Sequence, residues 1–162
     1  MISVWYDEDQ GRFGPFDARD SVARLEERGV SLQRVEKPGQ QQELSLVIAR
    51  VDSVVVTGLS PEARSRTVLV VFGGREEADW EAERQAHGWL GLVHPSVWFL
   101  FRAGKHPAWG LYGRPDVAAA AGLHATQHGL QPVGTPIGIH DLIARFLLAA
   151  ERMISESQPR SS

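Results

Sequence analysis

The hydrophobic pattern of the chain is strongest in two short runs, at residues 67–72 and 97–101. Neither run alternates apolar with polar positions, which is typical of strands that are covered on both faces. Between them, residues 75–88 are mostly charged and carry an alanine at every fourth position from Ala78 to Ala86. We therefore predict two central strands joined by a helix, with the alanine side of that helix packed on the sheet.

Shorter strands are predicted on the N-terminal side of this centre. Residues 2–6 alternate between apolar and polar side chains, which is the period of a half-buried strand. Residues 44–51 fit both a strand and a helix, and their β-branched content favours the strand. Residues 53–57 contain three consecutive valines and also predict a strand. We expect residues 53–58 to form a hairpin with residues 66–72, which would make this part of the sheet antiparallel.

Four helices are predicted from caps, glycine stops and apolar stripes, and they cover residues 17–28, 75–88, 115–128 and 137–154. Together with the strands they predict an α+β fold with a mixed, mainly antiparallel sheet. A three-layer α/β arrangement is the alternative. We expect residues 1–155 to form a single domain and the polar residues 156–162 to form a frayed tail.

The composition of the chain says more about its general class and its expected compartment than about its function. The chain has 162 residues, of which 43% are hydrophobic and 23% charged, as in an ordinary single globular domain. It contains no cysteine, which excludes disulfides and thiolate chemistry and suits a reducing compartment. Its first residues do not resemble a signal peptide, and no apolar run reaches membrane-spanning length. We therefore expect a cytoplasmic protein with no membrane partner.

Nucleic acid, metal and cofactor sites find little support. The net charge of −3 provides no basic surface for nucleic acid. His124 and His128 are spaced like metal ligands on the predicted helix 115–128, and His140 or Asp141 could supply a third ligand. The glutamate of the hydrolytic metal motif is missing, however, and a histidine near a helix C-terminus is favoured by the helix dipole alone. We predict no bound metal and no cofactor.

The turn after the first central strand is a candidate ligand site. Gly73 and Gly74 follow the run 67–72, and Arg75 comes next. Backbone N–H groups at such a strand-to-helix turn can bind a phosphate, and the arginine would add a positive charge. Neither the dinucleotide-binding nor the P-loop glycine pattern is present, and two glutamates at the helix start oppose a bound anion. A nucleotide-like ligand held by Gly73, Gly74 and Arg75 is therefore the alternative hypothesis.

The outer face of the predicted helix 75–88 is the favoured candidate surface. Trp80 and Arg84 lie four residues apart, on the side opposite the alanines, and His87 lies in the next turn. A tryptophan beside an arginine on an exposed face is typical of protein-binding hot spots. We predict that Trp80, Arg84 and His87 contact another protein or a second copy of the chain.

No sequence motif of serine, metal or nucleotide catalysis is present, and no serine lies in a nucleophile elbow. This favours a protein without enzymatic activity. The leading hypothesis is a small cytoplasmic protein that acts by protein–protein contact, for example an immunity or adaptor protein. The alternative is a small enzyme or binder that acts on a nucleotide-like ligand at the Gly73-Gly74 turn.

Overall fold

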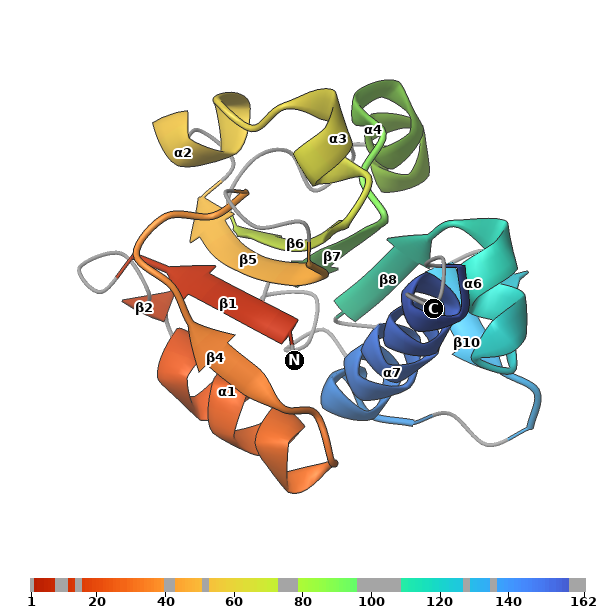
Figure 1. Cartoon of the computed structure of the whole chain (residues 1–162). Coiled ribbons are helices and arrows are strands. Elements are labelled where there is room, and N and C mark those ends of the chain that lie inside the picture. The colour runs from red at the N-terminus through yellow and green to blue at the C-terminus, as the bar shows by residue number, and fades with distance from the viewer. Residues whose placement is uncertain are drawn as a thin grey trace, which may run out of the picture.

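The centre of the molecule is a six-stranded sheet, shown in Figure 1. The computed structural model describes residues 2–7, 12–13, 16–39, 43–50, 53–72, 79–95, 109–126, 129–134 and 137–157. The strands of the central sheet, in spatial order, are β4 (Leu32–Arg34), β1 (Ile2–Tyr6), β5 (Ser45–Arg50), β6 (Thr67–Phe72), β7 (Gly91–Pro95) and β8 (Trp109–Gly113). The first five run parallel to one another, and β8 pairs antiparallel with β7.

Two small antiparallel sheets lie outside the central one. They are formed by β2 (Arg12–Phe13) with β3 (Phe16–Asp17), and by β9 (Leu123–Thr126) with β10 (Gly129–Pro132). The second pair, here called the β9–β10 hairpin, packs beside β8. Its approach is close, because a Cβ added to Gly129 would lie 2.7 Å from the carbonyl oxygen of Leu111. Gly129 also has a φ of +106°, so no other residue would fit this position without strain.

Helices cover both faces of the central sheet (Figure 1). Within the described residues they are α1 (Ala18–Glu27), α2 (Val54–Thr57), α3 (Pro61–Arg64), α4 (Trp80–His87), α6 (Pro115–Ala120) and α7 (Ile139–Ser157). One face carries α2, α3 and α4, and the other carries α1, α6 and α7. None of these helices combines the length and the apolar character that a membrane crossing needs.

Strand β6 shows why the central run has no polar alternation. Val68 and Val70 belong to the core beneath α7, whereas Leu69 and Val71 belong to the core beneath α4. All four are buried, because each face of this strand is covered by helices. The prediction that residues 67–72 form a strand covered on both faces is confirmed. The other predicted central strand, residues 97–101, lies outside the described residues.

The predicted combination of helices with a mixed sheet is confirmed, but the mainly antiparallel pairing is wrong. Its source is residues 53–57, which form α2 rather than a strand. Ser53 caps this helix, and Val56 packs into the core while Val54 is 82% exposed. The helical connection through α2 and α3 returns the chain to the edge of the sheet at which β5 begins. Strand β6 therefore starts beside the start of β5, and the two strands pair in parallel.

The predicted helices have mixed outcomes, and the structure has six described helices rather than about four. The predictions for residues 17–28 and 137–154 are confirmed by α1 and α7. The predicted helix 115–128 is wrong beyond Ala120, because Gly122 turns the chain with a φ of +74° and β9 follows. A run of alanines favours a helix locally, but here the next segment forms a strand that packs Leu123 into the core.

The close approach of α7 to the sheet depends on two glycines. Gly91 and Gly113 are register partners in β7 and β8, and the fully buried ring of Phe146 lies against both. A Cβ on Gly91 would lie 2.9 Å from Phe146 Cε1, and a Cβ on Gly113 would lie 2.6 Å from Cζ. Any larger side chain at either position would therefore displace the ring.

A polar contact joins the N-terminal end of α7 to α1. The hydroxyl of the buried Ser21 lies 2.9 Å from Nε2 of His140, and Arg28 Nε donates to Asp141 Oδ1 at 2.7 Å. Burial lowers the pKa of His140, and the positive charges of Arg24 and Arg28 lower it further. The neutral imidazole is therefore the form that suits the folded protein.

Because His140 is held neutral at its contact with Ser21, we expect the protein to lose stability at mildly acidic pH. The pKa of His140 is close to 6.5 in the unfolded chain and lower in the folded protein, so the unfolded state binds more protons in the interval between them. The contribution of neutral His140 to the free energy of unfolding is complete above about pH 6.5 and is lost as the pH falls through the folded-state pKa of His140. The free energy of unfolding then changes by at most about 1.4 kcal/mol per pH unit. Urea unfolding at a series of pH values should show a shallower dependence for His140→Gln. His87→Gln, on an exposed part of α4, is the control, and an unchanged slope in His140→Gln would contradict the assignment.

Candidate functional site

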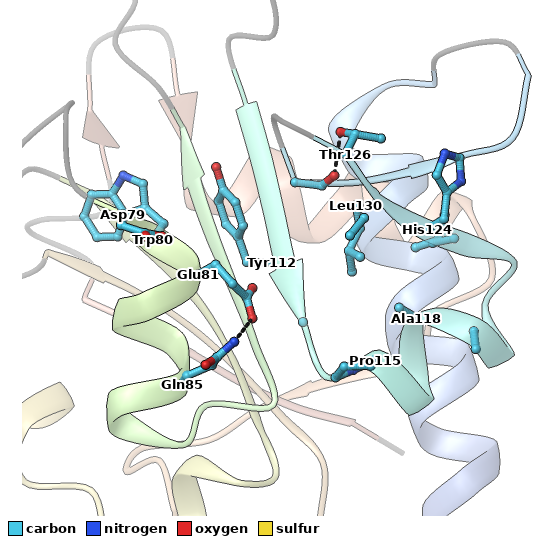
Figure 2. A pocket seen from close by; sticks show the side chains of 15 residues that line it. Asp79, Trp80, Glu81, Gln85, Tyr112, Pro115, Ala118, His124, Thr126 and Leu130 are labelled. Carbon is cyan, nitrogen blue, oxygen red and sulfur yellow. Dashed lines mark hydrogen bonds between the residues drawn. The ribbon is translucent and has the colours of Figure 1, made fainter.

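A hollow with a volume of about 590 Å³ lies beside the sheet, between α4, β8, α6 and the β9–β10 hairpin. Figure 2 shows Tyr112 of β8 standing between α4 and the hairpin. The lining residues are Asp79, Trp80, Glu81, Gln85, Tyr112, Gly113, Pro115, Ala118, Ala119, Leu123, His124, Ala125, Thr126, Gly129 and Leu130. We call this hollow the acidic groove, because the described residues of its lining include two carboxylates and no lysine or arginine. The volume lies in the range of ligand pockets.

The position of Tyr112 is set by the strand on which it lies. Its ring folds back over Gly110, where an added Cβ would lie 2.9 Å from both Cε2 and Oη of the tyrosine. Leu92 and His94 occupy the neighbouring strand, opposite Tyr112 and Gly110 respectively. The glycine therefore leaves the space that the half-buried tyrosine occupies at the groove wall.

The first turn of α4 forms the opposite wall. Asp79 is its N-cap, and Asp79 Oδ1 accepts a hydrogen bond from the backbone N–H of Ala82 at 3.1 Å. Trp80 then turns inward and stacks on the buried His94, with ring centroids 4.0 Å apart and an interplanar angle of 17°. The stack joins α4 to β7 and places the carboxylates of Asp79 and Glu81 at the groove.

A buried guanidinium holds the second carboxylate in place. Arg84 is 6% exposed and donates from Nε and Nη2 to Glu81, at 3.1 and 2.5 Å to Oε1, and from Nη1 to the carbonyl oxygen of Trp89. Gln85 donates to the same Glu81 oxygen at 3.0 Å. These contacts immobilise Glu81 while its side chain remains 38% exposed, so part of the carboxylate still faces solvent.

The burial of Tyr112 and the charges of this wall affect the pKa of the Tyr112 hydroxyl. Burial raises the pKa of the Tyr112 hydroxyl, and the negative charges of Asp79 and Glu81 raise it further. The hydroxyl therefore stays protonated at neutral pH and can both donate and accept a hydrogen bond. An aromatic ring beside two carboxylates is an environment that favours a cation.

The predicted contact surface on this helix is not assembled as expected. Trp80 and Arg84 are buried, at 8% and 6% exposure, whereas Ala82 and Ala86 are exposed. The prediction that the alanines face the sheet is wrong. The indole ring gains more from burial than two methyl groups do, and the buried guanidinium is compensated by its bonds to Glu81 and to the carbonyl oxygen of Trp89. Of Trp80, Arg84 and His87, only His87 reaches solvent, where it lies 3.4 Å from Glu83. A role of these three residues in a protein contact stays a prediction.

The alternative ligand site cannot be placed, because Gly73, Gly74 and Arg75 lie outside the described residues. The helix that was expected to begin at residue 75 begins at Trp80. Its free N–H groups are capped by Asp79, whose negative charge occupies the position that a bound phosphate would need. The described end of α4 therefore gives no support to an anion site.

The structure does not place the two candidate metal ligands, His124 and His128, together on a helix. His124 lies on strand β9, where it lines the acidic groove, and His128 lies outside the described residues. His140 lies on α7 and contacts Ser21. Within the described ranges, no three histidine, aspartate or glutamate side chains form a group that could hold a metal ion.

Sequence reasoning missed Asp79, Tyr112 and the hairpin as parts of one site. Asp79 followed by an apolar residue was available as an N-cap signal, and it would have moved the helix start from residue 75 to Trp80. No local signal relates Tyr112 to α4, since the two are brought together only by the pairing of β7 with β8.

Comparisons with protein-family models, with curated proteins and with solved structures find no match to this chain.

Proposed function

We propose that the protein acts by binding a segment of another protein in the acidic groove, through an arginine or lysine of that segment. The observation that supports this most directly is the position of Tyr112 beside Asp79 and Glu81, in a groove whose described lining residues include no basic side chain other than His124. A cationic side chain can stack on the tyrosine ring while Asp79, together with the solvent-facing part of the Arg84-paired Glu81, compensates its charge.

The shape of the groove favours a peptide segment over a compact ligand. Strand β9 lines the groove along its whole length and pairs, within the described residues, only with β10. An edge strand offers backbone donors and acceptors to an extended chain, which is a common mode of peptide recognition. Apolar lining from Leu123 and Leu130 would accommodate the side chains that flank the basic residue. Immunity and adaptor proteins act by contacts of this kind, and the proposal places the chain in that broad class.

The test uses a synthetic peptide as a probe for the basic segment. The capped pentapeptide Ala-Ala-Arg-Ala-Ala should bind, and the same peptide with citrulline in place of arginine should bind about tenfold more weakly, as expected for loss of one charge-assisted contact. NMR titration would follow both, with the Tyr112 ring and the Trp80 indole as reporters. Equal affinity of the two peptides, or shifts confined to other parts of the molecule, would contradict the proposal.

Asp79→Asn is the informative variant. Asparagine caps a helix as well as aspartate does, so α4 should remain folded while the groove loses one negative charge. We expect several-fold weaker binding of the arginine peptide and little change for the citrulline peptide. Glu62→Gln removes an equal charge from the exposed first turn of α3 and serves as the matched control. Equal losses of affinity in both variants would indicate a nonspecific charge effect.

A further inference from the structure

A second, smaller pocket lies on the same side of the sheet, between the α2–α3 segment and α4. Its volume is about 240 Å³, and we call it the α3–α4 pocket. Trp80 and Trp89 form part of its wall together with Leu69 and Leu92, all of which are buried. Trp80 is also part of the acidic groove, so the two cavities share one wall. The interior is thus apolar and rich in aromatic surface, as in pockets for small organic molecules.

Arg64 contributes a guanidinium group to the described lining of this pocket. The Nη1 atom of Arg64 donates to the carbonyl oxygen of Leu59 at 3.3 Å, which holds the guanidinium in place. The Nε atom of Arg64 is buried and has no hydrogen-bond partner. A buried N–H of a charged group without an acceptor is costly, and such groups are rarely left unpaired in folded proteins. Nε itself has almost no accessible surface, but a negatively charged ligand at the exposed part of the Arg64 side chain would compensate the cost of this buried charge.

The acidic side chain of the pocket lies at its rim. Glu83 and His87 are 3.4 Å apart, and their side chains are each more than half exposed. Glu83 is the only carboxylate among the described residues that line the pocket, and it already has a partner on its own helix. The charge offered to the pocket interior therefore comes from Arg64, and it is positive.

We propose that the α3–α4 pocket binds a small carboxylic acid with a single aromatic ring. The carboxylate accepts from the exposed part of the Arg64 guanidinium and compensates its charge, and the ring packs against the two tryptophans. A volume of about 240 Å³ suits a one-ring acid and is too small for a nucleotide. A guanidinium discriminates strongly between a carboxylate and the corresponding amide, because only the carboxylate offers two charged acceptors. This inference is independent of the peptide-binding proposal, which concerns the other side of Trp80.

The experiment titrates the protein with 3-phenylpropionate and, separately, with its neutral amide, 3-phenylpropanamide. Tryptophan fluorescence should report binding, since two of the five tryptophans line the pocket. We expect the acid to bind at least about tenfold more tightly than the amide. Equal affinity of the two compounds, or no saturable signal from the acid up to about 10 mM, would overturn the proposal without any variant being needed.

Two arginine variants then locate the site. Arg64→Met keeps the apolar stem of the side chain but removes its donors, so the preference for the acid should disappear. Arg66→Met is a matched control, because Arg66 Nε is also buried without a partner but lines a different cavity, next to Leu90 and Met153. The acid should bind to this control as it does to the unaltered protein. A preference that survives in Arg64→Met, or that is lost in Arg66→Met, would assign the acid to another place.

Discussion

Replacing Phe146 with alanine is expected to reduce the free energy of unfolding by about 3–5 kcal/mol. The ring is fully buried and lies against Gly91 and Gly113, which have no side chains that could move into the space it leaves. A cavity that cannot collapse gives the upper part of the usual range for such substitutions. Urea unfolding of the purified variant would measure the loss, with the midpoint and the slope reported separately.

The glycines offer an independent test of the same contact. Gly113→Ala should destabilise the protein by about 1–3 kcal/mol, because its new methyl group would press on the Phe146 ring. The loss should be partly reversed when Phe146→Leu is combined with it, giving a clear coupling energy in a double-mutant cycle. Strictly additive effects at positions 113 and 146 would show that α7 does not pack on the sheet in this way.

Trp80→Ala is expected to have an effect of similar size, about 3–5 kcal/mol. The indole is buried, it stacks on His94, and it separates the acidic groove from the α3–α4 pocket. Its removal would merge two cavities into one and leave His94 without its aromatic neighbour. Thermal and chemical unfolding of the isolated protein would measure the loss.

Trp80→Phe and Ala82→Ser provide the controls for this substitution. Phenylalanine keeps an aromatic ring against His94 and should retain a large part of the stability. Ala82→Ser changes an exposed position on the same helix and should alter stability by less than about 0.5 kcal/mol. A Trp80→Ala protein of unchanged stability would instead restore the view that this side chain is exposed for a partner.

The structural position of Trp80 also decides how function should be tested. A substitution that removes a shared wall affects both cavities, so loss of binding in a Trp80 variant would not distinguish them. Asp79→Asn alters only the charge of the groove, and Arg64→Met alters only the donor in the pocket. Each variant therefore reports on one of the two proposals.

Several elements could be predicted from the sequence because their signals are local. The apolar run at residues 67–72 has no alternation, so a strand covered on both faces was the natural expectation, and β6 confirms it. The amphipathic stripe of residues 137–154 likewise predicts α7, whose apolar side is decided by periodicity within the segment itself. Charge and composition similarly depend on no contact between distant residues.

The pairing of strands was decided by the tertiary structure. Three consecutive valines predict a strand at residues 53–57, but Ser53 and Gly58 at its ends and the burial of Val56 favour the short helix α2. That single change turns an expected hairpin into a crossover, and with it the sheet from mainly antiparallel to mostly parallel. Propensity is a small energy for each residue, and burial against the rest of the fold outweighs it.

The candidate sites were decided entirely by contacts between distant segments. Helical spacing alone could not show which side of α4 faces the sheet, since both the alanines and the Trp80–Arg84 pair form a consistent stripe. The outcome depends on partners elsewhere in the chain. The indole of Trp80 stacks on His94, and the guanidinium of Arg84 donates to the carbonyl oxygen of Trp89. Tyr112 joins this site only because β8 pairs with β7. The sequence by itself determined what the elements are made of, and the packing of α4 on the sheet determined which of its side chains are buried and which face solvent.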